Sequence, residues 1–220
     1  MSARYKNIFF DMDGTLIDSG AALCRSFAKV MSEETGRQVR PEEYAPYWGL
    51  PGEHAFKGYG IADEERINRG KKRWIRYYRE SQDWSPLFPG IEELLEELMR
   101  SGFVLGIVTS KTREELEAQL VRSPLAKWLP HRVNADDTRL HKPHPDPLLE
   151  IVKRLQVDKK DCLYVGDTLF DSQCAAGAGI DFALACWGLL FGEPEGIRAV
   201  AKPRRPADVL EVADGEVNAD

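Results

Sequence analysis

Two aspartates, Asp11 and Asp13, stand two positions apart directly after the apolar run 8–10 (IFF). Residues two apart on an extended strand share one side, so both carboxylates can point into one small space. Carboxylates that close repel each other, and proteins tolerate such a pair where a cation neutralises it or where one member keeps its proton. Gly14 permits a sharp turn, and Thr15 can open a loop or helix. The pattern fits a reactive acidic pair and, equally, an Asp-rich turn at the end of a strand.

Two other predicted strands also end in polar residues that suit chemistry on a phosphoryl group. One apolar run leads into Thr109 and Ser110, and another leads into Asp167. In open parallel sheets, ligands bind at the carboxyl ends of the strands, so these side chains can converge with Asp11 and Asp13. This convergence favours the reactive pair over the simple turn.

These residue types can divide the work of phosphoryl transfer among them. A carboxylate can attack phosphorus and split one hard hydrolysis into two easier steps, and Asp11 is the predicted nucleophile. Asp13 can give the leaving alkoxide its proton and later accept one from water. A hard cation such as Mg²⁺ takes oxygen ligands and lets an anionic carboxylate approach a phosphate. We expect Asp11, the backbone carbonyl of Asp13 and the carboxylate of Asp167 to hold this cation.

Further residues are candidates for support of the same reaction. The Thr109 hydroxyl and the Ser110 backbone N–H can donate to phosphoryl oxygens, and Lys142, in a proline-rich loop, adds a positive charge. Asp171 follows Asp167 by four positions, which places both on one face of a helix that starts between them. Asp171 can reach the metal through a water, orient Lys142, or favour a helix start through the macrodipole. The sequence leaves these roles of Asp171 open.

Strand and helix patterns alternate along most of the chain, which predicts an α/β fold with a central parallel sheet and helices on its faces. Apolar residues at helical spacing from Ile91 and from Leu148 predict two of the helices. Thr112 and Glu115 have the spacing of a capping box, so another helix should start there. The strands are expected at residues 5–10, 103–108, 131–134, 162–165 and 182–185.

Residues 17–83 interrupt the alternation, because they carry helical patterns at 21–31 and 63–79 but no strand pattern. A segment of this kind, directly after the aspartate pair, predicts a small all-helical cap domain inserted into a larger domain. We therefore expect an α/β core domain built from residues 1–16 and 84–220.

The cap should determine which substrate is chosen, since the core handles only the phosphoryl group. Residues 71–79 give a later cap helix a basic face, which is typical of a solvated surface. Five side chains lie around a turn rich in glycine and proline, and they can either face the core or pack within a helix–helix loop. They are Tyr47, Trp48, His54, Lys57 and Tyr59. We expect His54 and Lys57 to meet a second charge, which favours a small anionic or polar organic phosphate.

Four ordered segments resemble the four motifs of the haloacid dehalogenase superfamily. They are residues 11–16 (DMDGTL), 108–111 (VTSK), 142–145 (KPHP) and 166–171 (GDTLFD). Their order and spacing match across nearly the whole chain, with the helical insert where that family places its mobile cap. The branch most similar to this chain is the phosphoglycolate-phosphatase-like hydrolases.

The resemblance implies a three-layer α/β sandwich with a helical cap, in agreement with the alternating pattern. It also implies a Mg²⁺-dependent phosphatase that forms an aspartyl phosphate on a small phosphorylated metabolite. Carried over residue by residue, Asp11 is the nucleophile and Asp13 the acid and base. Thr109 and Lys142 bind phosphate, and Asp167 binds the metal.

Other branches and another class of protein resemble the chain less well. Dehalogenases lack an aspartate at the position of Asp13, and phosphonate hydrolases carry a small residue there. A sugar phosphomutase stays open, although mutases tend to have an apolar residue where Thr15 stands. A non-catalytic phosphoacceptor module is shorter, lacks a cap and has no use for an acid and base after its aspartate.

Composition and charge limit the partners and the cellular location that we expect for the protein. The chain has 220 residues and a formal net charge of −6, without a long basic run to follow a nucleic-acid backbone. No stretch approaches about 18 consecutive apolar residues, and no signal-peptide pattern precedes the first strand. We expect a cytoplasmic protein that binds neither nucleic acid nor membrane, and the sequence does not indicate its oligomeric state.

Overall fold

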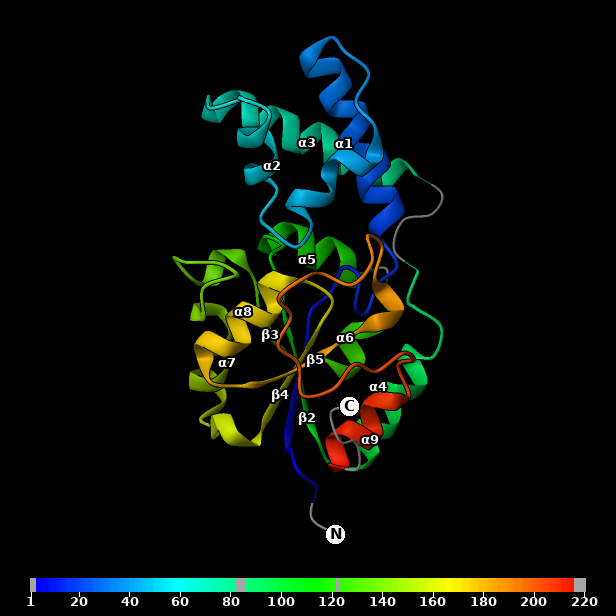
Figure 1. The fold of residues 1–220 in the computed structure, drawn as a ribbon, viewed down its shortest axis with the longest axis vertical. Helices are drawn as coiled ribbons and strands as arrows, with labels where there is room; N and C mark the ends of the chain where they lie inside the picture. The colour runs from blue at the N-terminus through cyan, green and yellow to red at the C-terminus, as the bar shows by residue number, and fades with distance from the viewer. Residues whose placement is uncertain (1–2, 82–85, 122, 216–220) are drawn as a thin grey trace.

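A parallel β-sheet forms the centre of the molecule, with helices on both of its faces (Figure 1). The computed structural model describes residues 3–81, 86–121 and 123–215. In this part of the chain the sheet has five strands in the order β3-β2-β1-β4-β5. The strands are β1 (Asn7–Phe10), β2 (Val104–Val108), β3 (His131–Val133), β4 (Cys162–Gly166) and β5 (Asp181–Leu184). All five predicted strands and the predicted three-layer α/β class are confirmed.

Side chains alternate between the two faces of the sheet, and each face has its own apolar core. Ile8 and Phe10 of β1 pack with one cluster, and Phe9 packs with the other. The first cluster includes side chains of α4 (Ile91–Arg100), α5 (Arg113–Leu120), α6 (Leu125–Trp128) and α9 (Asp208–Asp214). The second includes side chains of α7 (Asp146–Leu155) and α8 (Leu169–Ala178).

The strand order reverses at β1, which pairs with β2 on one side and with β4 on the other. Phe10, the last residue of β1, lies beside Ile107 and Val165, so the three strands end at nearly the same level. The residues that follow them therefore meet at one edge of the sheet. Ligands bind at such a switch point in open α/β sheets.

Two helices of the core, α5 and α8, start with a side-chain capping box. The predicted capping box at the start of α5 is present: the Glu115 carboxylate accepts the Thr112 N–H at 2.7 Å. Thr168 and Asp171 form a second box at the start of α8. Short 3-10 turns occupy Pro41–Tyr47, Ala135–Asp137, Lys159–Asp161 and Cys186–Gly188.

Three further helices lie over the carboxyl edge of the sheet, at the top of Figure 1. They are α1 (Gly20–Thr35), α2 (Glu53–Gly58) and α3 (Glu64–Glu80), and α1 and α3 match the two predicted insert helices. Their shared core is aromatic: the Phe27 ring centroid lies 4.7 Å from that of Tyr44 and 5.4 Å from that of Trp74. We propose that residues 17–83 form the cap domain, although the boundary at 83 lies outside the described residues.

None of the helices in the described ranges is long and apolar enough to cross a lipid bilayer.

Candidate active site

The sheet edge at β1 brings together most of the residues that the sequence predicts to act in catalysis. Asp11 and Asp13, after β1, line one cavity with Thr109 and Ser110, after β2. Lys142 reaches the same place from its proline-rich loop, with its Nζ atom 2.8 Å from Oδ1 of Asp11. Convergence at the carboxyl edge, which the sequence analysis expected, is therefore present.

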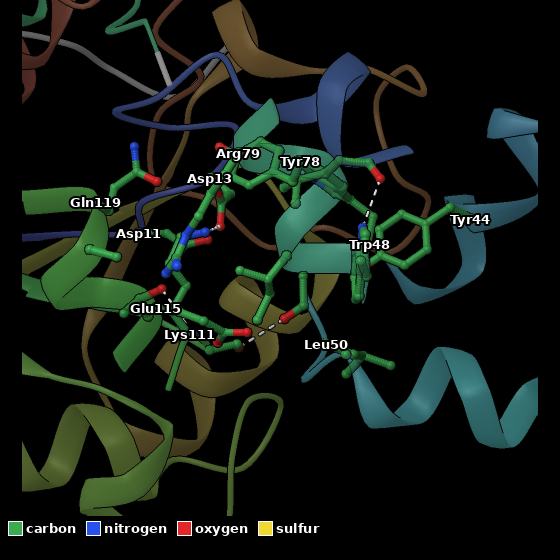
Figure 2. A pocket seen from close by; sticks show the side chains of 18 residues that line it. Asp11, Asp13, Tyr44, Trp48, Leu50, Tyr78, Arg79, Lys111, Glu115 and Gln119 are labelled. Carbon is green, nitrogen blue, oxygen red and sulfur yellow. Dashed lines mark hydrogen bonds and ion pairs between the residues drawn. The ribbon is translucent and has the colours of Figure 1, made fainter. Parts of the chain in front are cut away.

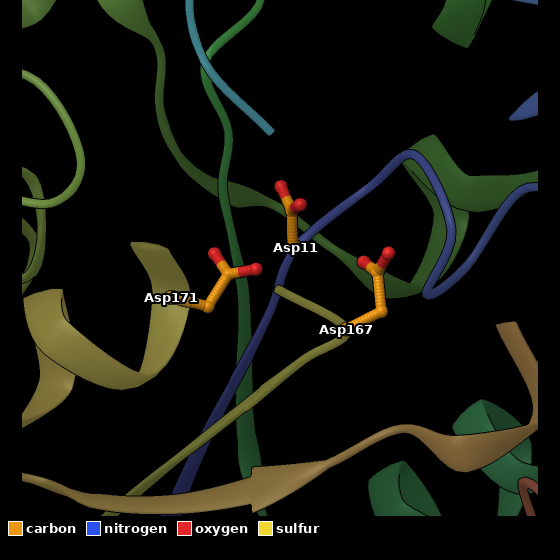
Figure 3. A group of neighbouring side chains, drawn as sticks. All are labelled: Asp11, Asp167 and Asp171. Carbon is orange, nitrogen blue, oxygen red and sulfur yellow. The ribbon is translucent and has the colours of Figure 1, made fainter. Parts of the chain in front are cut away.

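Three buried carboxylates share a small volume beside this cavity. Asp11, Asp167 and Asp171 each offer an oxygen within 4.8 Å of the others (Figure 3). In the part of the chain that the structure describes, Lys142 is the cation in contact with them, so with all three ionised two negative charges would lack compensation. Burial raises the pKa of Asp11 to about 7 although Lys142 opposes the change. Burial and then repulsion by Asp171 and Asp11 raise the pKa of Asp167 well above its ordinary value.

This excess of negative charge fits a hard divalent cation. Mg²⁺ prefers oxygen ligands, usually takes only one or two carboxylates from a protein, and favours their charged forms. The carboxylates of Asp11 and Asp167 lie close enough together to serve as two such ligands, and the backbone carbonyl of Asp13 stays a predicted third.

Asp171 is fully engaged in holding Lys142 and the start of α8. Its Oδ1 atom lies 2.7 Å from Nζ of Lys142 and 2.8 Å from the hydroxyl of Tyr164. Its Oδ2 atom accepts the Thr168 hydroxyl at 2.5 Å and the Thr168 N–H at 3.1 Å. The geometry thus favours two of the roles that the sequence left open, orientation of Lys142 and support of the helix start.

Tyr164 is a supporting residue that the sequence analysis missed. It lies fully buried in β4, and its hydroxyl accepts from Nζ of Lys142 at 3.0 Å. In the sequence, an aromatic residue within an apolar strand indicates only a side chain of the hydrophobic core. The one indication of a further role was its hydroxyl, because a buried tyrosine hydroxyl usually needs a hydrogen-bond partner.

Asp13 stands apart from the buried cluster and faces the cavity. Its Oδ1 atom accepts the Ser19 hydroxyl at 2.5 Å, and Nζ of Lys111 lies 2.6 Å from its Oδ2 atom. Burial lowers the pKa of Lys111, but the charge of Asp13 more than offsets this, so the pKa is raised overall. Lys111 therefore stays charged beside the predicted acid and base. Lys111 has no role in the sequence-based prediction, although its place directly after Thr109 and Ser110 was a usable signal.

The turn after β1 depends on Gly14. Its φ angle is +80°, and a Cβ atom there would collide with the carboxylate of Asp167. Glycine is thus required both for the left-handed backbone and for the close approach of two motifs.

The cap closes over this edge and leaves a small cavity of about 90 Å³. Figure 2 shows Asp11, Asp13 and Lys111 from the core facing Tyr44 and Trp48 from the cap. Of the five cap residues around the predicted turn, Trp48 reaches the site: its indole N–H donates to Oδ2 of Asp167 at 2.7 Å.

The structure does not bring His54 and Lys57 to the cavity, which corrects that part of the sequence-based hypothesis. Helix α2 buries Ala55 and Phe56 in the cap core, so His54 and Lys57 lie on its exposed side. Lys57 instead pairs with Glu53 at 3.2 Å.

Several residues outside the predicted set line the cavity, among them Arg79 and Gln119. Arg79 belongs to the basic face that the sequence indicated to be solvated, and it approaches the cavity at the end of α3. Gln119 lies on α5, only 2 % exposed, and its Nε2 atom has no hydrogen-bond partner in the described ranges. A polar residue on an amphipathic helix is normally solvated, so neither stood out in the sequence.

Acid should weaken cation binding at this site. Metal ligands must be deprotonated, and without metal the pKa of Asp11 is about 7. A proton therefore competes with Mg²⁺ below pH 7, and affinity should fall by roughly tenfold per pH unit for each proton displaced. Calorimetry at pH 6 and pH 8, in buffers of different ionisation enthalpy, measures both the affinity and the proton release. Equal affinity at the two pH values, without proton release, would contradict this expectation.

Comparison with known proteins agrees with the geometry. Residues 8–185 match the haloacid dehalogenase-like hydrolases. The phosphoglycolate phosphatase of Escherichia coli K12 is 29 % identical, over 86 % of this chain and 84 % of its own. The pyrophosphatase PpaX of Bacillus cereus B4264 is also 29 % identical, over 84 % of this chain and 85 % of its own.

Solved structures give the same result. A Lactobacillus plantarum protein is 31 % identical with a TM-score of 0.83, and the match covers 94 % of this chain and 99 % of that one. A Pseudomonas syringae hydrolase, 24 % identical with a TM-score of 0.83 over 98 % of this chain and all of its own, shares the fold. The resemblance seen in the sequence and the expected class of enzyme are confirmed: the chain belongs to the haloacid dehalogenase-like hydrolase family.

Proposed function

We propose that the protein is a Mg²⁺-dependent phosphatase that cleaves a small organic phosphomonoester through an aspartyl phosphate on Asp11. The observation that carries this proposal is the contrast between the two aspartates of the first motif. Asp11 is buried against Lys142 among other carboxylates, whereas Asp13 faces the cavity beside Lys111. This contrast supports attack on a bound phosphoryl group by Asp11 and proton exchange with that group by Asp13.

The role of the Mg²⁺ ion in this proposal is electrostatic. When bound by Asp11, Asp167 and the backbone carbonyl of Asp13, Mg²⁺ would offset the repulsion between the Asp11 carboxylate and an anionic phosphoryl group.

In the first step, a carboxylate oxygen of Asp11 forms a bond to phosphorus and the ester P–O bond breaks. Asp13, in its protonated form, gives its proton to the departing alkoxide. The Thr109 hydroxyl, the Ser110 backbone N–H and the Lys142 ammonium group bind the phosphoryl oxygens as their charge redistributes.

In the second step, water attacks the phosphorus of the aspartyl phosphate. Asp13, now charged, accepts a proton from this water, and the bond between phosphorus and the Asp11 oxygen breaks. Phosphate leaves, and both aspartates return to their starting forms. Lys111 and Ser19 hold the Asp13 carboxylate in place for both proton transfers.

The relatives support a small phosphorylated substrate. One is a phosphoglycolate phosphatase and another a pyrophosphatase. CbbY from Rhodobacter sphaeroides, solved in complex with phosphate, shares the fold at 21 % identity and a TM-score of 0.75, over 93 % of this chain and 96 % of its own. The size of the cavity and its cationic residues Lys111 and Arg79 fit a small anionic metabolite.

The leaving group should determine the effect of Asp13→Asn. An alkoxide needs a proton, so cleavage of an alkyl phosphate should slow by about 10²- to 10⁴-fold. p-Nitrophenolate leaves without one, so the first turnover of p-nitrophenyl phosphate should stay fast and only the hydrolysis of the aspartyl phosphate should slow. Rapid-mixing kinetics should then show a burst of one p-nitrophenolate per active site.

Glu115→Gln is the matched control, because Glu115 lines the same cavity and glutamine preserves its capping box. It should show no dependence on the leaving group. An Asp13→Asn variant that loses the same factor with both substrates, without a burst, would exclude Asp13 as the acid and base.

A further inference from the structure

Trp48 connects the cap directly to a predicted metal ligand of the core. Its indole N–H donates to Oδ2 of Asp167 at 2.7 Å, while the Thr15 hydroxyl donates to Oδ1 at 3.0 Å. Trp48 is 9 % exposed, and its ring packs edge-on against those of Tyr44 and Phe191. The hydrogen bond is thus buried, with aromatic rings packed against Trp48 and a second donor on the Asp167 carboxylate.

Gly49, the residue after Trp48, also contacts the core. The backbone carbonyl of Gly49 accepts the Ser110 hydroxyl at 3.0 Å. Gly49 has a φ angle of +85°, and a Cβ atom there would come within 2.8 Å of the Thr168 side chain. Residues 48–50, here termed the cap loop, therefore contact two of the motifs that follow strands, and glycine is needed for this close fit.

An indole N–H is only a donor, so it suits an ionised carboxylate. Asp167 has two oxygens with a donor on each, which fixes the plane of its carboxylate and leaves further lone pairs for a cation. Hydrogen bonds of this kind orient metal ligands, and their loss typically costs 10- to 100-fold in metal affinity. Of the two donors on Asp167, one comes from the core and the other from the cap.

We propose that Trp48 is a positioning residue that couples docking of the cap loop to Mg²⁺ binding at Asp167. The proposal rests on the proposed function in that it takes Asp167 as a metal ligand. Docking of the loop orients Asp167 and raises the affinity for Mg²⁺. By linkage, Mg²⁺ stabilises the docked loop by the same factor.

The test is calorimetric titration of the substrate-free protein with Mg²⁺. Trp48→Phe keeps the ring and removes the donor, and it should bind Mg²⁺ about 10- to 100-fold more weakly than wild type. Trp74→Phe is the matched control, because the Trp74 indole donates to the Leu23 carbonyl within the cap and not to the core. It should bind Mg²⁺ as wild type does.

A second variant separates the indole from the loop that carries it. Gly49→Ala should keep the loop from docking and weaken Mg²⁺ binding as Trp48→Phe does. The double variant Trp48→Phe/Gly49→Ala should be no weaker than the weaker single variant, because both remove the same contact. Hydrogen exchange gives the reciprocal measurement: Mg²⁺ should slow exchange at residues 48–50 in wild type and much less in Trp48→Phe.

The coupling is overturned if Trp48→Phe binds Mg²⁺ within about twofold of wild type, binds it more tightly, or loses no more than Trp74→Phe. It is also overturned if Gly49→Ala weakens binding and Trp48→Phe does not. Failure of the proposed function looks different, since wild type itself would then show no saturable Mg²⁺ binding.

Discussion

Asp11→Asn should abolish phosphatase turnover and yet give a protein at least as stable as wild type in the absence of metal. An amide does not attack phosphorus, and removal of a covalent nucleophile typically costs about four to six orders of magnitude in kcat. Stability should not fall, because the substitution removes one of three crowded carboxylates while Lys142 keeps its partner Asp171.

The raised pKa of Asp11 determines the direction in which stability changes with pH. The pKa of Asp11 is about 7 in the folded protein, above the value of about 3.9 in an unfolded chain. A raised pKa means that the folded state binds the proton more tightly, so this contribution is present in acid and is lost as pH rises to 7. Between pH 5 and pH 8 this contribution should fall by roughly 3 kcal/mol in wild type, and the fall should be absent from Asp11→Asn.

Urea unfolding in EDTA at pH 5 and pH 8, together with steady-state assays on p-nitrophenyl phosphate, measures both effects. Turnover by Asp11→Asn within tenfold of wild type would remove Asp11 as the nucleophile. A stability loss at pH 8 comparable to that of a disrupted core would contradict the charge argument.

Lys142→Met should destabilise the protein strongly as well as inactivate it. The Lys142 ammonium group lies between Asp11 and Asp171, 2.8 Å from one and 2.7 Å from the other, with its side chain 1 % exposed. Removal of one partner from a buried ion pair leaves an uncompensated charge and typically costs about 3–5 kcal/mol. Activity should fall with it, because the phosphoryl group also loses a fixed positive charge.

Two comparisons distinguish this effect from a general loss of packing. The cost of Lys142→Met should be smaller at pH 5 than at pH 8, because Asp11 takes up a proton below about pH 7. Lys57→Met removes an exposed lysine from a surface pair and should cost less than about 1 kcal/mol. Equal losses of unfolding free energy in the two variants would contradict the central position of Lys142.

The core of the site was predictable because its positions follow from local patterns. Each strand is a short apolar run, and the first residue with a carboxylate or hydroxyl after it must lie at the carboxyl edge of a parallel sheet. Asp11, Thr109 and Asp167 were located in this way, without knowledge of any long-range contact. Lys142 needed more, since only its proline-rich loop, taken together with the other three elements, distinguished it from other lysines.

The contribution of the cap was not predictable in the same way. Trp48 and Asp167 are 119 positions apart in sequence, and their hydrogen bond depends on how the helices of the insert pack. The sequence located the turn around Trp48 but not the side of α2 that faces outward. Helix α2 is only six residues long, too short for periodicity to assign its faces, and so His54 and Lys57 were misplaced.

The most direct test of the proposed mechanism is the mass of the peptide that contains Asp11, measured after Asp13→Asn protein is mixed with p-nitrophenyl phosphate and Mg²⁺ and quenched in acid. An aspartyl-phosphate mechanism predicts one phosphoryl group on Asp11, formed as fast as the burst of p-nitrophenolate and removed by hydroxylamine. A burst of p-nitrophenolate with an unmodified Asp11 peptide, or with the phosphoryl group on another residue, would contradict it.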